Sequence, residues 1–401
     1  MNVLFLSIAG IGDLKSQGIY GDLLKTFRDH GHAVYAVNPQ EQGADLPTKC
    51  EDVEGVKVLR VRTGNLQKCG LVEKGISQLR LERQYLSAIE RHFAGVHFDL
   101  ILYPTPPTTL GGLVGKLKRE HGAMTYLLLK DIFPQNSLDL GMLSERGLRG
   151  LAYRYFKRTE RRTYEASDFI GCMSEANRRY LVEHEPWIDA EKVEVNPNSL
   201  IPRDMPDVDK VVLRERFGIP ADARLFTYGG NLGKPQAIDF LVRVLRLNEE
   251  RGGVFFAVAG AGTERHLLEE YFEEERPERS RLLPLLPRED FDSLLRASDC
   301  GVVLLDHRFT IPNFPSRSLS YLQAGIPYVA ATDDVSDVGT LAEVEGFGVR
   351  VGSIDEARFL EVCESLSSEE LRRMGAAGCR YFEGNCTAER SYRLIMEHVN
   401  D

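Results

Sequence analysis

Short runs of apolar residues alternate along the chain with segments in which apolar residues recur every three or four positions. Val3–Ile8 is the first such run, residues 20–27 have apolar positions at helical spacing, and His32–Val37 is the next run. Short apolar runs are typical of strands buried in a parallel sheet, and the longer period is typical of amphipathic helices. Further runs are Phe98–Tyr103, Thr125–Leu129 and Asp168–Cys172. The first half is therefore predicted to be an α/β domain with a parallel sheet.

The pattern stops after residue 200 and then begins again. Residues 201–207 read Ile-Pro-Arg-Asp-Met-Pro-Asp, a polar, proline-containing segment without periodicity, which is typical of a linker. Apolar runs return at Leu225–Tyr228, Val254–Val258, Cys300–Leu305 and Tyr328–Ala331, with a helical pattern at Ile238–Leu247. We predict two domains, residues 1–203 and 204–385, and a C-terminal helix in 386–401. That helix either crosses back to the first domain or stays with the second.

Composition and charge narrow the class of protein. Of 401 residues, 43% are hydrophobic and 27% are charged, and the formal net charge is -10. These values are typical of a soluble globular protein and argue against nucleic-acid binding, which needs a basic surface. The seven cysteines are dispersed without a CxxC pair, so we expect reduced thiols and no structural metal site. The N-terminus lacks a basic region, and no apolar run reaches the roughly 18 residues of a spanning helix, so a cytoplasmic protein is expected.

Three glycine-rich turns follow predicted strands. They contain Gly10 and Gly12, then Gly229, Gly230 and Gly233, then Gly260 and Gly262. Glycine allows close backbone approach, and the N-terminus of a following helix offers N–H groups to a phosphate, although turn geometry alone also explains such glycines. The first turn lacks the third glycine of GxGxxG, and Asn38 stands where a dinucleotide-binding fold carries an acidic residue. NAD and FAD are therefore not expected.

A set of motifs in fixed order carries a more specific signal. The second half contains Gly229–Gln236, Gly260–Glu264, Leu294–Val302, Phe314–Tyr321 and Ala324–Pro327, and the first half contains Gly31-His32, Asp131–Pro134 and Asn196–Asn198. In this order the motifs resemble those of family 4 glycosyltransferases of the GT-B fold. The resemblance is greatest to the bacterial enzymes that assemble capsule, O-antigen or exopolysaccharide units.

The resemblance implies two facing Rossmann-like domains with parallel sheets and an interdomain cleft. It implies a nucleotide-sugar donor held by the C-terminal domain, an acceptor held by the N-terminal domain, retention of anomeric configuration, and no metal or other cofactor. A departing nucleoside diphosphate develops negative charge, so its site must supply cations and oriented donors. Arg317 and Lys234 are the candidate cations. The full set of candidate donor-binding residues is Gly12, Gly230, Asn231, Gly233, Lys234, Gly260, Gly262, Pro287, Ser316, Arg317 and Ser320.

The sequence departs from the family pattern at four positions. Two glutamates are common before the Ala-Gly-x-Pro turn, where this chain has Pro312 and Ser320. The common arginine and lysine of the first turn are replaced by Asn231 and Gln236. The polysaccharide subgroup often has Asn and Gln at these two positions, so an active enzyme is still expected. The identity of the donor sugar stays open.

Lys130 and Asp131 are the candidate catalytic residues of the first domain, together with Arg317 of the second. The histidine that the family places near the donor sugar has no clear counterpart here. Lys130 and Asp131 follow a predicted strand, and the carboxyl ends of parallel strands line the ligand crevice of open α/β sheets. Asp131 is expected to align the acceptor hydroxyl or to orient Lys130. The alternative is that Asp131 only caps the turn that follows.

A basic run occupies a predicted helix in the first domain. It consists of Arg146, Arg149, Arg154, Lys157, Arg158, Arg161 and Arg162. One interpretation is a solvated helix face on which Glu160 and Glu165 form ion pairs. The other is contact with anionic lipid or with a lipid-diphosphate acceptor.

The leading hypothesis is a retaining glycosyltransferase that uses a sugar nucleotide, with UDP as the expected nucleotide. Its acceptor would be a polysaccharide or lipid-linked saccharide at the inner face of the cytoplasmic membrane, with peripheral contact to anionic lipid. One alternative is a GT-B-fold sugar-nucleotide epimerase or hydrolase, which needs no acceptor. The other is a non-catalytic partner of a second transferase, suggested by the missing glutamates.

Overall fold

The computed structural model describes residues 1–8, 11, 14, 16–41, 43, 46–65, 71–205, 207 and 209–400, and only the backbone of 71–76, 79 and 400. The chain forms two compact units. Unit 1 contains Met1–Ile201 and Ala388–Asp401, and unit 2 contains Pro202–Thr387. Gly10 and Gly12, the glycines of the first expected phosphate turn, lie outside the described residues.

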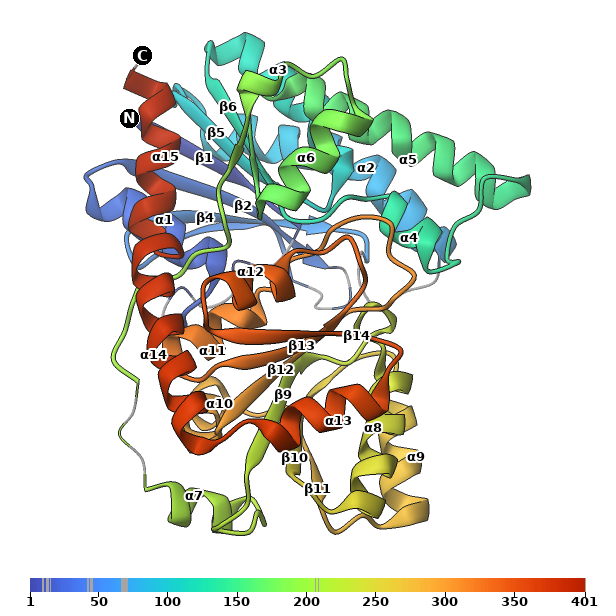
Figure 1. Ribbon diagram of the computed structural model, residues 1–401. Coiled ribbons are helices and arrows are strands. Elements are labelled where there is room, and N and C mark those ends of the chain that lie inside the picture. Colours follow the sequence, from blue (N-terminus) through green and yellow to red (C-terminus); the bar gives the residue numbers. More distant parts are fainter. Residues whose placement is uncertain are drawn as a thin grey trace. The chain divides into compact units, whose positions relative to one another are not determined.

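Unit 1 is built on an eight-stranded sheet with the order β3-β4-β2-β1-β5-β6-β7-β8 (Figure 1). The strands are β1 Asn2–Leu6, β2 Ala33–Glu41, β3 Lys49–Val53, β4 Val56–Thr63, β5 Leu100–Thr105, β6 Met124–Leu129, β7 Phe169–Cys172 and β8 Val193–Val195. All neighbouring pairs are parallel except β3 and β4. The predicted parallel sheet is therefore confirmed, and one antiparallel pair, β3 with β4, is added at its edge in unit 1.

The antiparallel edge strand was missed for a physical reason. β3 reads Lys-Cys-Glu-Asp-Val and is largely exposed, so it lacks the apolar run of a buried strand. It joins β4 through Glu54 and Gly55, whose φ angles are 54° and 77°. Two successive residues with positive φ form the turn type that suits the twist of a two-residue hairpin.

Helices cover both faces of the unit 1 sheet. They are α1 Ile19–Asp29, α2 Leu71–His92, α3 Gly111–His121, α4 Gln135–Asp139, α5 Gly147–Ala166, α6 Glu175–His184 and α15 Ala388–Asn400, with 3-10 turns η2 Thr108–Leu110 and η3 Ala190–Lys192. Leu4 and Leu6 of β1 pack in the core beneath α2 and α3. Val3 and Phe5 pack in the core beneath α1. Because successive strand residues face opposite sides, a fully apolar strand is needed to fill both cores.

The C-terminal helix α15 packs on unit 1. Ile395 is fully buried in the core beneath α1. The Tyr392 ring stacks on the His30 ring with centroids 4.0 Å apart, and His398 Nε2 lies 3.1 Å from Glu194 Oε2. Of the two positions that the sequence left open for this helix, the structure has the one on the first unit.

Unit 2 has a six-stranded, entirely parallel sheet with the order β11-β10-β9-β12-β13-β14. Its strands are β9 Leu225–Asn231, β10 Phe255–Ala261, β11 Ser280–Leu283, β12 Cys300–Leu304, β13 Tyr328–Thr332 and β14 Gly348–Gly352. Its helices are α7 Lys210–Arg216, α8 Ile238–Arg251, α9 Arg265–Glu275, α10 Arg288–Ala297, α11 Arg317–Ala324, α12 Val338–Val344, α13 Glu356–Ser365 and α14 Ser368–Asn385, with the 3-10 turn η4 Lys234–Gln236.

The strand orders locate one switch point in each unit. In unit 1 the chain proceeds from β1 to β2 on one side and returns to β5 on the other. In unit 2 it proceeds from β9 to β10 and returns to β12. Helices that follow the two central strands then lie on opposite faces, which opens a crevice at the carboxyl ends of these strands. The sites for ligands are therefore expected after β1 and β5 in unit 1, and after β9 and β12 in unit 2.

Candidate functional site

Arg317 lies at the switch point of unit 2. It is the first residue of α11, and its guanidinium carbon is 4.5 Å from the centroid of the Tyr228 ring on β9. The Nη1 atom is buried and has no hydrogen-bond partner among the described residues. A Cβ atom built on Gly230 would be 3.9 Å from the same guanidinium carbon. Arg317 is half-buried as a whole. A guanidinium group with a buried, unused donor atom next to a glycine backbone suits the binding of an anionic ligand.

Tyr228 supports the guanidinium from one face. Its hydroxyl donates to the backbone oxygen of Asn231 at 2.6 Å, which fixes the ring at the end of β9. Burial raises the pKa of Tyr228, and the charge of Arg317 opposes that rise. The phenol therefore stays neutral and its ring face remains available for the cation. Sequence reasoning did not single out Tyr228, because a tyrosine inside a buried strand has no local sign of a role at a site.

Asn231 and Gln236 interact with each other. The Asn231 Nδ2 atom donates to Gln236 Oε1 at 2.9 Å across the η4 turn. A Cβ atom built on Gly233 would lie 3.1 Å from the Asn231 amide, so Gly233 leaves room for this pair. Family 4 glycosyltransferases commonly carry an arginine and a lysine at positions 231 and 236. Here the two positions hold a neutral amide pair, whose hydrogen bond rigidifies the η4 turn. This leaves Arg317 as the cation beside Gly230 among the described residues.

Gly260 and Gly262 are required by packing. A Cβ atom on Gly260 would be 1.9 Å from the Gly230 oxygen, and one on Gly262 would be 2.3 Å from the Leu232 carbonyl. The Leu232 N–H donates to the Ala261 oxygen at 2.9 Å, which holds the two turns together. These contacts explain both glycines through the close approach of β9 and β10, whether or not a ligand also touches them.

We expect Gly262→Ala to destabilise the protein by roughly 1–3 kcal/mol, because the new methyl group must displace backbone atoms. Chemical denaturation of the purified chain measures the change. Gly352→Ala is the matched control, since nothing lies within 4 Å of a Cβ atom built on Gly352. Unchanged stability together with lost nucleotide binding would contradict the packing role and favour a role in ligand contact.

Lys234 lines a different depression of unit 2. The pocket encloses about 330 Å³ and is lined by Lys234, Ala237, Asp239, Phe240, Arg243, Glu264, Asp306, His307, Arg308 and Ser353. Arg308 Nε donates to Asp306 Oδ1 at 2.8 Å, so that cation is already paired. The lining set includes neither Arg317 nor Gly230. Of the two expected cations, Lys234 therefore lines this pocket and Arg317 does not.

The remaining donor-site candidates occupy the ends of helices. Ser316 is the exposed N-cap of α11 and makes no side-chain cap, and Ser320 is half-buried one turn further along. Pro287 is the N-cap of α10. The N–H of Ser318 donates to the Pro315 oxygen at 3.2 Å, so one amide of the first turn is already used. Contact of Ser316, Ser320 and Pro287 with a donor stays a prediction.

Lys130 and Asp131 follow β6, next to the switch point of unit 1. Asp131 Oδ2 accepts a hydrogen bond from Asn136 Nδ2 at 2.8 Å, whereas Asp131 Oδ1 is buried without a partner among the described residues. Lys130 Nζ is 3.4 Å from the Asn196 oxygen. The Thr105 hydroxyl, at the end of β5, donates to the backbone carbonyl oxygen of Asp131 at 3.1 Å. One carboxylate oxygen is thus held by the fold and the other is left to receive a donor.

Burial changes the ionisation of both residues. It raises the pKa of Asp131 to about 6, although the Ile132 backbone N–H and Asn136 oppose the rise. It lowers the pKa of Lys130 to about 8. A carboxyl group and an amine whose pKa values lie on either side of neutrality are suited to binding and transferring protons. The interpretation of Asp131 as a turn cap is incomplete, because a cap leaves no reason for the unpartnered Oδ1.

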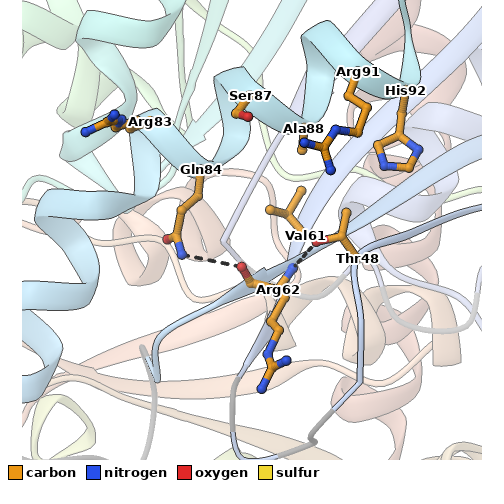
Figure 2. A pocket seen from close by; sticks show the side chains of 9 residues that line it. All are labelled: Thr48, Val61, Arg62, Arg83, Gln84, Ser87, Ala88, Arg91 and His92. Carbon is orange, nitrogen blue, oxygen red and sulfur yellow. Dashed lines mark hydrogen bonds between the residues drawn. The ribbon is translucent and has the colours of Figure 1, made fainter.

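A second pocket lies beside α2 and β4 in unit 1. It encloses about 330 Å³ and is lined by Thr48, Val61, Arg62, Arg83, Gln84, Ser87, Ala88, Arg91 and His92. Figure 2 shows Arg91 and His92 pointing toward Val61 and Thr48, while the Arg62 and Arg83 side chains point away. The Gln84 amide donates to the Arg62 oxygen at 3.4 Å. Since the lining residues include neither Lys130 nor Asp131, we assign this pocket no part in the reaction.

Metal ligands are not gathered in the described part of the chain, where no three His, Cys, Asp or Glu side chains are arranged to hold an ion. The expectation that the reaction needs no metal or other cofactor stays a prediction. Cys50, Cys172, Cys300, Cys363, Cys379 and Cys386 are free thiols.

The sequence of this chain is similar to that of known glycosyltransferases. A family model described as a glycosyl transferase 4-like domain matches residues 20–199. The putative colanic acid biosynthesis glycosyl transferase WcaI of Escherichia coli is 26% identical over 231 residues, which are 57% of this chain and 56% of WcaI. The probable glycosyltransferase WbjE of Pseudomonas aeruginosa is 24% identical over 315 residues, which are 76% of this chain and 74% of WbjE.

The fold as a whole also has solved counterparts. The crystal structure of HepE from Anabaena in complex with UDP aligns over 100% of both chains with a TM-score of 0.68 and 15% sequence identity. At this identity the match concerns the fold alone. The chain therefore carries a glycosyl transferase 4-like domain over residues 20–199, within unit 1, and its two doubly wound units have the GT-B fold.

Proposed function

We propose that this chain transfers a sugar from a UDP-sugar, with retention of anomeric configuration, to a lipid-linked saccharide or polysaccharide acceptor in the assembly of a surface polysaccharide. The observation that carries the proposal is the Arg317 guanidinium, which has a buried, unpartnered Nη1 atom beside Gly230. A leaving nucleoside diphosphate gains negative charge as the glycosidic bond to it breaks, and a fixed cation in a site from which water is excluded stabilises that charge.

The order of elements in unit 2 supports the proposal that a diphosphate binds beside Arg317 and Gly230. Gly230, the next-to-last residue of β9, has a φ of 117°, so its backbone is free of a side chain where the crevice opens. The Asn231–Gln236 pair holds the following turn in one conformation. UDP as the nucleotide is supported by HepE, whose structure contains UDP. A role in surface polysaccharide assembly is supported by the naming of WcaI for colanic acid biosynthesis.

Unit 1 is proposed to bind the acceptor. The unpartnered Oδ1 atom of Asp131 accepts a hydrogen bond from the attacking hydroxyl, and Asn136 holds the other oxygen in place. In this role Asp131 aligns the hydroxyl and takes up its proton as the new glycosidic bond forms. Lys130, anchored near the Asn196 oxygen, supplies positive charge to an anionic acceptor or to the departing group.

The place of action is proposed to be the cytoplasmic face of the membrane, where lipid-linked acceptors are accessible to a peripheral protein. Within the described part of the chain no helix is long and apolar enough to cross a bilayer. The protein's formal net charge of -10 supports the expectation that nucleic acid is not a partner.

Nucleotide binding provides the direct test. We expect UDP to raise the stability of the chain, by about 2.7 kcal/mol when its free concentration is one hundred times its dissociation constant. A thermal unfolding series with UDP, GDP, ADP, TDP and UMP at equal concentrations measures the preference. UMP lacks the second phosphate and should give a smaller shift. Stabilisation by another diphosphate and not by UDP would contradict the proposed donor, and no response to any nucleotide would contradict donor binding altogether.

A further inference from the structure

The N-terminal half of α5 exposes a stripe of apolar side chains to solvent. Leu148 is 86% exposed, Leu151 57% and Tyr155 40%. Their spacing of three and four residues places them on one side of the helix. Met142, in the turn before the helix, is 51% exposed as well. Single exposed apolar residues are common, but a continuous stripe on one helix face is typical of a surface that binds something.

Arginines surround this stripe. Five of them are exposed and have no ion pair among the described residues, namely Arg146, Arg149, Arg154, Arg158 and Arg162. Residues 146–159 contain no Asp or Glu. We call these five arginines, together with Met142, Leu148, Leu151 and Tyr155, the α5 surface. It is a local concentration of positive charge on a chain whose formal net charge is -10.

The rest of the helix is held firmly by unit 1. Thr163 and Tyr164 are buried, and the Thr163 hydroxyl donates to the Thr108 oxygen at 2.8 Å. The Phe156 ring packs against Phe133 with centroids 4.8 Å apart. Figure 1 shows the N-terminal end of α5 reaching beyond the neighbouring helices of unit 1. The anchored end fixes the helix, and the free end presents its apolar stripe outward.

Ion pairing explains the anchored end of the basic run but not the free end. Lys157 Nζ lies 2.6 Å from Glu160 Oε2, and Arg161 Nε lies 2.9 Å from Glu165 Oε1. The interpretation of a solvated face with paired charges therefore holds for these residues. It does not account for arginines without carboxylate partners around exposed leucines.

We infer that the α5 surface docks on an anionic lipid bilayer. A helix with leucine and an aromatic ring on one side and arginines around them lies in the interface of a bilayer, with its apolar side chains among the acyl chains and its guanidinium groups at the phosphates. Charge complementarity commits the partner to anionic rather than neutral lipid. The inference does not depend on the proposed transfer reaction, although it would bring unit 1 to the place where lipid-linked acceptors occur.

Vesicle flotation tests this inference with the full chain. We expect binding to vesicles of equal parts phosphatidylglycerol and phosphatidylcholine, and weaker binding as salt is added. The variant with Arg149→Gln, Arg154→Gln and Arg158→Gln should partition roughly 100-fold less, since each cation near an anionic surface contributes about fivefold. The matched control carries the same change of charge on α14, with Arg372→Gln, Arg373→Gln and Arg380→Gln, and should bind as the natural chain does.

A fluorescence measurement reports on the apolar stripe itself. Trp187 is the only tryptophan, so Leu148→Trp in a Trp187→Phe chain places a single reporter on the α5 surface. Its emission should shift to shorter wavelength when anionic vesicles are added, and Val344→Trp, at another exposed apolar position of α12, should not shift. Equal binding to neutral vesicles, no loss in the α5 variant, or preferential binding of RNA would each overturn the inference. Thermal unfolding confirms that every variant is folded.

Discussion

Arg317→Ala is expected to lower kcat by at least about 100-fold, which corresponds to the loss of a preorganised group that stabilises charge in the transition state. The reason is local. Arg317 is the cation beside Gly230 among the described residues, and the amide pair of Asn231 and Gln236 cannot replace its charge. In the part of the chain that the structure describes, the Nη1 atom has no hydrogen-bond partner to lose, so most of the effect should appear in the reaction rather than in folding.

Two further variants separate the charge of Arg317 from its shape. Arg317→Lys keeps the charge but loses the planar group that stacks on Tyr228, so activity should recover only in part. Arg372→Ala removes an exposed arginine of α14 and should leave kcat unchanged. The rates come from single-turnover assays with a donor that has been shown to bind. An Arg317→Ala chain with near-natural turnover would end the assignment of this residue to the leaving group.

Asp131→Asn is expected to lower kcat by about 100-fold to 10,000-fold, because the amide keeps the shape of the side chain but cannot take up a proton. Asn136 can still hydrogen-bond to the oxygen that remains, so the local structure should be preserved. The same change should stabilise the protein. Loss of activity with a gain in stability is the opposite of what a purely structural cap would give.

The pH dependence follows from the raised pKa of Asp131, which is about 6 instead of 3.8 because the carboxyl group is buried. The folded state therefore binds this proton more tightly than the unfolded state, and the stability of the natural chain should fall as pH rises from about 4 to about 6. The resulting cost is at most about 3 kcal/mol above pH 6. Activity that needs the carboxylate should fall in the other direction, as pH drops below about 6.

Both quantities can be measured on the same pair of proteins. Urea denaturation between pH 4 and pH 7 gives the difference in stability between the natural chain and Asp131→Asn, which should grow with pH and then level off. The pH profile of kcat/KM should lose its acidic limb in the variant's residual activity. If Asp131→Asn is less stable at pH 7 and fully active, Asp131 is only a turn cap.

Fully buried elements could be predicted from the sequence, and partly exposed ones could not. β5 and β12 are buried along their length, as are β1 after its first residue and β9 up to Gly229, and these stretches are mostly apolar. β3 and β14 have exposed or half-buried positions between the apolar ones, so their pattern resembles that of a loop. An edge strand buries less apolar surface and can therefore carry polar residues. The apolar run by which a strand is predicted is then missing from the sequence.

At the candidate site the sequence identified residue types, and folding determined their surroundings. The sequence motifs indicate both Arg317 and Asp131, because a charged residue that follows a predicted strand can be identified from the sequence alone. The sequence does not indicate that Arg317 and Asp131 each have an unpartnered atom. It also does not indicate that Arg317 stacks on Tyr228 or that Asp131 contacts Asn136. The amide pair at Asn231 and Gln236 had been seen only as a loss of two cations.

The sequence by itself determined that the chain forms two α/β units with glycine-rich strand ends. Burial requires apolar residues and unusual backbone conformations favour glycine, and both can be recognised at single positions. Only the tertiary structure decided why Gly260 must be glycine, where α15 packs, and which arginines remain unpaired. These properties depend on which atoms from distant parts of the chain come within a few ångströms of one another. Such distances are set by the packing of whole elements, which no local pattern of residues encodes.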